Sequence, residues 1–199
     1  LPVMEGKALL FKEFAGIDAY PIVLNTKEPD EIVAIVKAIS PGFAGINLED
    51  ISAPRCFEIE KRLKHELSIP VMHDDQHGTA IIVLAGLLNA LKVVKKEIES
   101  VKVTISGAGA AGTAISKILL LVGIKDIWVV DRLGIIHRDR KDLTPEKYEL
   151  ASITNHDNKS GSMKEAFIGR DVFIGVSGPN LVTPEMIKSM NKDSIVFTL

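Results

Sequence analysis

Residues 101–131 read VKVTISGAGAAGTAISKILLLVGIKDIWVVD, and this stretch decides the fold. It begins with a β-branched apolar run, Val101–Ile105, and passes through a glycine-rich turn. A helical run over Thr113–Val122 follows, and then a second apolar run over Asp126–Val130. Two strands joined by a helix form a βαβ unit, which implies a parallel sheet with a right-handed crossover. The stretch therefore predicts an α/β fold with a doubly wound parallel sheet.

The turn between the first strand and the helix is Gly107-Ala108-Gly109-Ala110-Ala111-Gly112. Small residues let the backbone approach a pyrophosphate, and the amide groups at the helix start supply donors and a positive dipole end. A glycine turn that binds no ligand is the alternative interpretation. The position between a strand and a helix favours dinucleotide binding by a Rossmann-like domain.

Two further residues are candidates for contacts with the dinucleotide. Asp131 follows the second strand and lies 24 residues after Gly107, close to the ~20 residues expected for an acid that binds the ribose. An acid that accepts both ribose hydroxyls favours NAD. The neighbouring Arg132 could instead meet the 2′-phosphate of NADP, so NADP stays possible. Ser177 follows a later predicted strand and could line the cofactor pocket, although a plain turn explains it equally well.

Two acidic pairs come directly after two other predicted strands. Glu49-Asp50 follows Phe43–Leu48, and Asp74-Asp75 follows Ile69–Met72. Helix capping explains either pair alone, but ligands bind at the carboxyl edge of α/β sheets. Because like charges repel at close range, two adjacent pairs at one edge favour a bound cation. Ligands that are all oxygen suit Mg²⁺ or Mn²⁺.

Lys7 lies after Gly6 near the start of a predicted helix, where a positive charge opposes the helix dipole. An ordinary surface lysine is one interpretation of this position. A lysine in a partly desolvated site beside a cation has a lowered pKa, and can then act as a base near neutral pH. The sequence around Lys7 does not decide between the two.

The composition is that of a globular protein, because 46% of the 199 residues are hydrophobic and 25% are charged. The net charge of −2, with no block of like charge, argues against binding to nucleic acid or an anionic membrane. The apolar run Ala80–Leu91 is shorter than the ~20 residues of a membrane span and predicts a core helix. With the single cysteine Cys56 and no signal peptide, these features predict a cytoplasmic protein.

Apolar periodicity predicts an alternation of helices and strands along the whole chain. Helices are expected around residues 8–14, 29–39, 53–67, 78–94, 113–122, 145–153, 163–168 and 184–190, and strands over 20–24, 43–48, 69–72, 101–105, 126–130, 172–176 and 195–199.

These residues, in this order, resemble the malic enzymes, especially the compact bacterial and archaeal type. The resemblance rests on residues 1–8 (LPVMEGKA), 46–50 (INLED), 73–80 (HDDQHGTA), 107–112 (GAGAAG) and 176–180 (VSGPN). It implies oxidative decarboxylation of L-malate to pyruvate and CO₂ by a divalent-metal-dependent homo-oligomer, a dimer or larger, that reduces NAD or NADP. Residues 1–76 would then be part of the substrate and metal domain, and 77–199 the NAD-binding domain.

The resemblance also implies roles for single residues, carried over by position. Lys7 would be the proton acceptor and Asp74 its supporting neighbour, while Glu49, Asp50 and Asp75 would bind the metal ion. The turn Ala108–Ala111 would hold the cofactor pyrophosphate. The family's segment with a catalytic tyrosine and its Asn-Pro motif are both absent, so we expect this chain to be a portion of a longer enzyme that lacks both ends.

Two other classes of function fit the same motifs. One is a related enzyme, either a hydroxy-acid dehydrogenase that does not decarboxylate or a malolactic-type enzyme that holds NAD tightly. The other is a nucleotide-sensing module that binds NAD without metal-dependent turnover. Formation of pyruvate, CO₂ and net NADH together would distinguish a malic enzyme from both.

Overall fold

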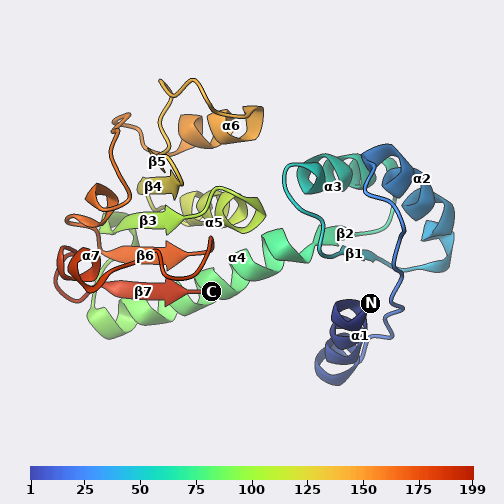
Figure 1. Cartoon of the computed structure of the whole chain (residues 1–199). Helices are drawn as coiled ribbons and strands as arrows, with labels where there is room; N and C mark the ends of the chain where they lie inside the picture. The colour runs from blue at the N-terminus through green and yellow to red at the C-terminus, as the bar shows by residue number, and fades with distance from the viewer. The chain divides into compact units, whose positions relative to one another are not determined.

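The computed structural model describes residues 1–199, which form two compact units. Unit 1 comprises Leu1–Ile51 and Arg55–His73, and unit 2 comprises Ser52–Pro54 and Asp74–Leu199 (Figure 1). Each unit has a hydrophobic core of its own.

Unit 1 combines a short parallel sheet with helices. Its elements are α1 (Pro2–Ala15), α2 (Pro29–Ile39), the 3₁₀ helix η1 (Ser40–Gly42), β1 (Ile46–Leu48), α3 (Arg55–Glu66) and β2 (Val71–His73). Strands β1 and β2 pair in parallel with Leu48 opposite His73. Apolar residues of α2, α3 and both strands form the core, among them Val33, Ile59 and Leu63. The strands predicted over residues 43–48 and 69–72 are therefore confirmed, although both are shorter than predicted.

The strand predicted over Tyr20–Leu24 is wrong, because this segment contains no strand. Tyr20, Ile22 and Val23 are exposed. Pro21 has no N–H to donate to a ladder, and β-branched residues form a strand only where a neighbouring strand pairs with them.

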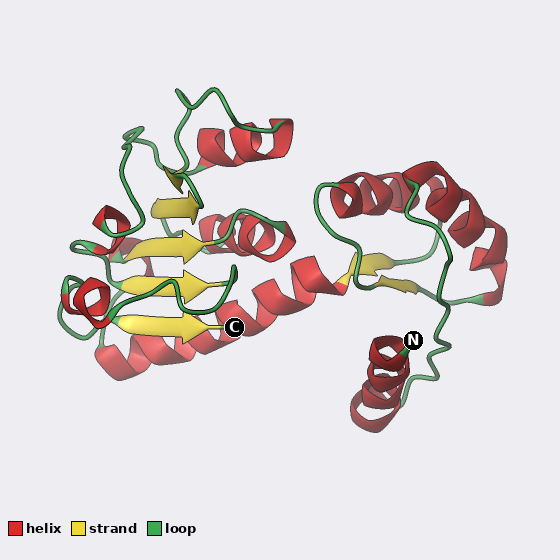
Figure 2. Cartoon of the chain, viewed as in Figure 1, coloured by secondary structure: helices red, strands yellow, loops and turns green.

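Unit 2 is built on the sheet that residues 101–131 predict. Its elements are α4 (Asp74–Val94), η2 (Ile98–Ser100), β3 (Lys102–Ser106), α5 (Ala110–Leu121), β4 (Asp126–Asp131), β5 (Gly134–Ile135), α6 (Pro145–Ile153), η3 (Glu165–Phe167), β6 (Val172–Gly175), α7 (Pro184–Lys188) and β7 (Ile195–Thr198). The five strands lie in the order β5-β4-β3-β6-β7 (Figure 2). All neighbours are parallel except β5, which pairs antiparallel with β4. The predicted βαβ unit is confirmed.

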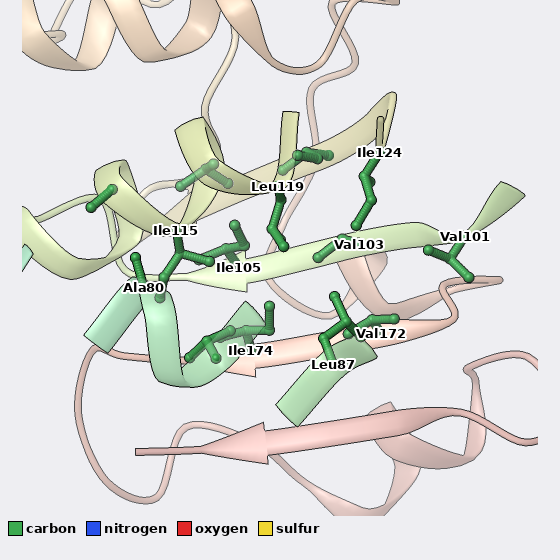
Figure 3. Close-up of a cluster of buried hydrophobic side chains, with 14 of the residues drawn as sticks. Ala80, Leu87, Val101, Val103, Ile105, Ile115, Leu119, Ile124, Val172 and Ile174 are labelled. Carbon is green, nitrogen blue, oxygen red and sulfur yellow. The ribbon is translucent and has the colours of Figure 1, made fainter. Parts of the chain in front are cut away.

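Both faces of this sheet are covered. On one face, alternate side chains such as Val103 and Ile174 pack with Leu87 of α4 and Leu119 of α5 (Figure 3). On the other face, Phe173 packs in a second cluster with residues of η3 and α7. Helices on both faces are what a doubly wound sheet requires, so the predicted fold class is confirmed.

Helix α4 begins at Asp74, four residues before the predicted start. By length and composition it is the one helix in the structure that could cross a membrane, a test that core helices of soluble proteins also pass. Ala80, Val83, Leu87 and Leu91 of this helix belong to the main core of unit 2. Other apolar residues, such as Ile82 and Val93, are exposed, so only one face of α4 is buried and the prediction of a buried core helix holds for that face alone.

The helix predicted over residues 163–168 is wrong in type, since only the 3₁₀ turn η3 forms there. Gly169, with a φ of 66°, follows directly and ends the segment. A left-handed residue at this place stops a helix from continuing.

Candidate active site

The glycine turn lies at the point where the order of the strands in the sheet reverses. From β3 the chain adds β4 and β5 on one side of β3, and it then adds β6 and β7 on the other side. Ser106, the last residue of β3, stands opposite Val130 of β4 and Gly175 of β6. The N–H of Gly107 donates to the carbonyl of Val130 at 2.9 Å. Such a switch point at the carboxyl ends of parallel strands is where doubly wound sheets bind nucleotides.

The three glycines of the turn are required for different reasons. Gly107 has a φ of 121°, and a Cβ there would lie 2.9 Å from the carbonyl oxygen of Val176. A Cβ on Gly112 would overlap the carbonyl oxygen of Gly107. The absence of a side chain at Gly112 therefore allows α5 to pack closely against the turn. Around Gly109 a Cβ would meet no protein atom within 4 Å. The space beside the Gly109 backbone would let a ligand approach the main chain closely.

Gly109 is also the N-cap of α5, and no side chain caps this helix. The first N–H groups of a helix have no partner within the helix. Together with the helix dipole, they fit a pyrophosphate placed at the turn.

Ser177, which the sequence offers as a candidate for the cofactor pocket, contacts the last residue of β3 just before this turn. Its Oγ is 2.8 Å from the Oγ of Ser106, and the residue is exposed. The structure thus brings together the ends of β3 and β6, which are distant in sequence.

Asp131 ends β4 and takes part in an ion cluster that the sequence did not indicate. Arg140 donates to both carboxylate oxygens of Asp131, at 2.8 and 3.1 Å. Lys147 donates to Oδ2 at 2.6 Å, and the N–H of Leu133 donates to Oδ1 at 3.0 Å. Arg140 and Lys147 reach Asp131 only because the chain turns back through β5 and α6, so no local motif signals the contact.

The cluster keeps Asp131 ionised. Burial raises the pKa of Asp131, but hydrogen bonds from Arg140 and Lys147 outweigh burial and lower it to about 2. Because the folded-state pKa lies below the ordinary value of 3.8, ionisation of Asp131 stabilises the folded state fully above pH 3.8. That stabilisation is lost as the pH falls toward 2.

We therefore expect Asp131→Asn to lower the free energy of unfolding near neutral pH by about 2 kcal/mol, because folding lowers the pKa of Asp131 from 3.8 to about 2. The difference from the wild-type protein should shrink below pH 3.8, because the wild-type carboxyl then becomes protonated as well. Urea unfolding of both proteins at pH 7, 4 and 2.5 measures this. A difference that does not change with pH would contradict an electrostatic role.

In unit 1, Lys7 and Glu49 lie together although they are far apart in sequence. Lys7 Nζ in α1 is 3.4 Å from Oε2 of Glu49, which follows β1. The Glu49 side chain is only 7% exposed and that of Lys7 is 27% exposed. Asn47 Nδ2 donates to the same Glu49 oxygen at 3.0 Å. A nearly buried carboxylate is thus held between a cation and an amide.

This pair lines a cavity of about 720 Å³ in unit 1, together with Asn47 and Asp50. Most other lining residues are apolar and come from α1, the segment 17–24 and β1. Asp50 has a φ of 57°, in the left-handed region that non-glycine residues seldom adopt. A concave site of this size with a few polar groups suits a small molecule.

The second acidic pair, Asp74-Asp75, forms the first turn of α4. Negative charge is favoured at this end of a helix. The Asp74 carboxylate lies against Gly78, since a Cβ on Gly78 would overlap its Oδ1. The predicted ligands Glu49 and Asp50 thus belong to unit 1 and Asp75 to unit 2. The structure contains no group of three or more His, Cys, Asp or Glu residues placed to hold a metal ion.

We expect Gly78→Ala to slow the reaction at the candidate site without lowering the stability of the protein. Alanine favours a helix over glycine by about 1 kcal/mol, so the melting temperature should stay equal or rise. The new Cβ forces the Asp74 carboxylate to move, and we expect the rate of a reaction catalysed at this site of the full-length protein to fall about tenfold or more, as when a catalytic group is misplaced. Thermal melting and steady-state kinetics measure both effects. Gly86→Ala, which would meet Phe197 of the core at 3.3 Å, is the control for a glycine of α4 away from the acidic pair.

Comparison with known families gives a consistent result along the chain. The family model for the malic enzyme N-terminal domain matches residues 1–64. The family model for the malic enzyme NAD binding domain matches residues 76–199.

Similar proteins include two bacterial malic enzymes. The chain is 61% identical to an NAD-dependent malic enzyme of Geobacillus stearothermophilus, covering 100% of this chain and 42% of the relative. It is 55% identical to a bifunctional malic/malolactic enzyme of Bacillus subtilis, covering 100% of this chain and 49% of that protein. The chain thus spans somewhat less than half the length of these relatives.

A solved structure resembles the whole chain. The crystal structure of the NAD-dependent malic enzyme from Thermotoga maritima superposes with a TM-score of 0.96 at 52% sequence identity. The match covers 100% of this chain and 53% of the other.

Proposed function

The chain belongs to the malic enzyme family, and from this membership we propose that the full-length protein catalyses oxidative decarboxylation of L-malate. The products are pyruvate and CO₂, with reduction of NAD or NADP. The observation that carries the proposal is the Lys7–Glu49 pair in a cavity of unit 1 sized for a small molecule. The dinucleotide turn of unit 2 supports it.

We assign residues 1–76 to the substrate and metal part, and 77–199 to the nucleotide-binding part. In the second part, residues Gly107 to Gly112 receive the pyrophosphate, Ser177 lines the pocket and Asp131 faces the adenosine ribose. The open side of Gly109 and the uncapped start of α5 support the assignment of the turn.

Glu49, Asp50 and Asp75 are the proposed ligands of Mg²⁺ or Mn²⁺. Their carboxylates are the hard oxygen donors that these ions prefer, and Glu49 is nearly buried beside a cation already. A divalent ion held by these carboxylates would supply Lewis acidity.

Lys7 is the proposed base for the C2 hydroxyl of malate, and Asp74 the proposed support for Lys7. Lys7 Nζ lies 3.4 Å from Oε2 of Glu49, and both residues line the same cavity. In its neutral form a lysine placed there can accept the proton of a hydroxyl bound in the cavity.

We further propose a cytoplasmic homo-oligomer that acts on a small-molecule substrate without nucleic acid or membrane. The single cysteine, Cys56, is fully buried in α3, which fits a reducing compartment without disulfides.

The proposal is tested on the purified full-length protein with L-malate and NAD. We expect NADH to form with Mn²⁺ present, to stop after EDTA treatment and to resume when Mn²⁺ is added back. D-malate should not replace L-malate. NADH formation that EDTA leaves unchanged would overturn the proposal.

A malolactic reaction is the second candidate, because the Bacillus subtilis relative carries both names. It would convert L-malate to lactate without net NADH. Lactate assayed in the same reaction mixtures separates the two reactions.

A further inference from the structure

The side chain of Asn47 makes a single hydrogen bond, and its partner is Glu49. Asn47 Nδ2 donates to Oε2 of Glu49 at 3.0 Å. The other end of the amide, Oδ1, is buried and accepts no hydrogen bond. An amide that served only the fold would pair both ends, since a buried acceptor without a donor costs stability. The Asn47 side chain is therefore directed at the Glu49 carboxylate at a cost in stability.

Asn47 is held more rigidly than the carboxylate that it contacts. It is the central residue of β1, which pairs with β2, and it stands opposite Met72 (Figure 1). Glu49 comes directly after β1, outside the paired residues. Residues two apart along an extended chain point to the same side, so this spacing brings the amide beside the carboxylate. The strand thus sets the position of the donor, and the donor sets that of the carboxylate.

Lys7 contacts the same oxygen of Glu49 but is less suited to fix it. Its Nζ is 3.4 Å from Oε2, and its side chain is 27% exposed. It extends from α1, a helix without a buried residue. As the proposed base, Lys7 also changes its charge in each turnover, whereas the amide of Asn47 keeps its donor throughout. Of the two donors, only Asn47 can hold the carboxylate in one place through both protonation states of Lys7.

We infer that Asn47 is a positioning residue, which fixes the Glu49 carboxylate in the orientation needed to bind the divalent ion. The inference deepens the proposed function and rests on it, because Glu49 is a proposed ligand. Groups that hydrogen-bond to metal ligands orient them, and losing one typically costs about 10–100-fold in metal affinity. A glutamate side chain loses much rotamer freedom when it is fixed, so ordering it before the ion arrives favours binding.

The Mn²⁺ affinity of the full-length protein, measured by calorimetry, tests the inference. Asn47→Leu has a similar size and no donor, and we expect it to weaken Mn²⁺ binding about 10–100-fold. Its melting temperature should change little, because leucine removes the unpaired acceptor Oδ1 together with the donor. Asn47→Gln keeps an amide, and residue 47 lines a cavity with room for the extra methylene. Its Mn²⁺ affinity should therefore stay within a few-fold of the wild-type value.

Steady-state kinetics separates positioning of the metal ligand from a general structural role. In Asn47→Leu, we expect the Mn²⁺ concentration for half-maximal NADH formation to rise about as much as the dissociation constant of Mn²⁺. At saturating Mn²⁺, kcat should fall less than about tenfold, because excess ion offsets a loss of affinity. A fall in kcat that excess Mn²⁺ does not restore, together with wild-type Mn²⁺ affinity, would overturn the inference.

Asn47→Ala and Asn25→Ala form a matched pair of variants. Asn25 is exposed, belongs to the same unit and does not line the cavity. We expect Asn25→Ala to bind Mn²⁺ as the wild-type protein does, and Asn47→Ala to bind it as weakly as Asn47→Leu. The alanine variant decides the outcome should leucine prevent folding.

Wild-type Mn²⁺ affinity in the variants that lack the donor would overturn the inference alone. A wild-type full-length protein that binds no Mn²⁺ would overturn the proposed function as well.

Discussion

Replacing Lys7 with alanine in the full-length protein should lower the rate of L-malate oxidation by about 10²–10⁴-fold, the usual effect of losing a general base. Decarboxylation of added oxaloacetate should fall much less. The hydroxyl proton has to leave only in the oxidation step, whereas the second step depends chiefly on stabilisation of negative charge on the substrate oxygens. Both half-reactions are measured at saturating Mn²⁺ and nucleotide.

Lys12→Ala is the matched control for this substitution. Lys12 lies in the same helix, is exposed and pairs with Asp18 at 2.7 Å. It should leave both half-reactions unchanged, because a surface ion pair contributes little. If Lys7→Ala slows both half-reactions equally, Lys7 positions the substrate or serves the enol stage, and its assignment as a dedicated base is wrong.

Asp75→Asn should abolish metal-dependent turnover and weaken Mn²⁺ binding by at least ~100-fold. Groups that merely support metal ligands already cost 10–100-fold when removed, and a neutral amide is a poor ligand for a hard cation. The protein should remain folded, because asparagine is tolerated at a helix start. Mn²⁺ binding by calorimetry, beside turnover and thermal melting, separates these effects.

The control for Asp75→Asn is Asp30→Asn, the same change in the first turn of α2. Asp30 pairs with Arg62 at 2.7 Å on the surface of unit 1. It should alter stability slightly and leave Mn²⁺ affinity unchanged. Wild-type Mn²⁺ affinity in Asp75→Asn would remove Asp75 from the proposed ligands.

The sheet of unit 2 was predictable because local signals agree there. The glycines at 107 and 112 are demanded by close backbone approach, and the flanking apolar runs supply the buried strands β3 and β4. Helix α6 begins and ends where the periodicity predicts, since Thr144 caps its start. Where intrinsic propensity, helix capping and core packing all favour the same element, that element can be predicted from a single sequence.

The start of α4 was harder to predict. Gly78 resembles a helix boundary, but the helix runs through it and begins at Asp74. Glycine is tolerated there because the Asp74 side chain occupies the space where a Cβ would stand. Apolar periodicity does not indicate that the Asp74 side chain folds back onto residue 78 and leaves no room for a Cβ there.

The contacts of the candidate site depend on the tertiary fold. No local pattern indicates that Lys7 reaches Glu49, because α1 and β1 are joined by a long segment without strand structure. Only the resemblance to the malic enzymes implied that both residues belong to one site. Arg140 and Lys147 likewise look like ordinary surface cations until the turn through β5 brings them to Asp131. Residue types and strand ends predict which groups carry chemistry, whereas ion-pair partners follow from packing.

Product stoichiometry tests the central claim most directly. The full-length protein is incubated with L-malate, NAD and Mn²⁺, and pyruvate, CO₂ and NADH are measured against malate consumed. We predict equal amounts of all three products, because oxidation and loss of CO₂ belong to one reaction. Oxaloacetate accumulating without CO₂, or lactate formed without net NADH, would contradict the assignment as an oxidatively decarboxylating malic enzyme.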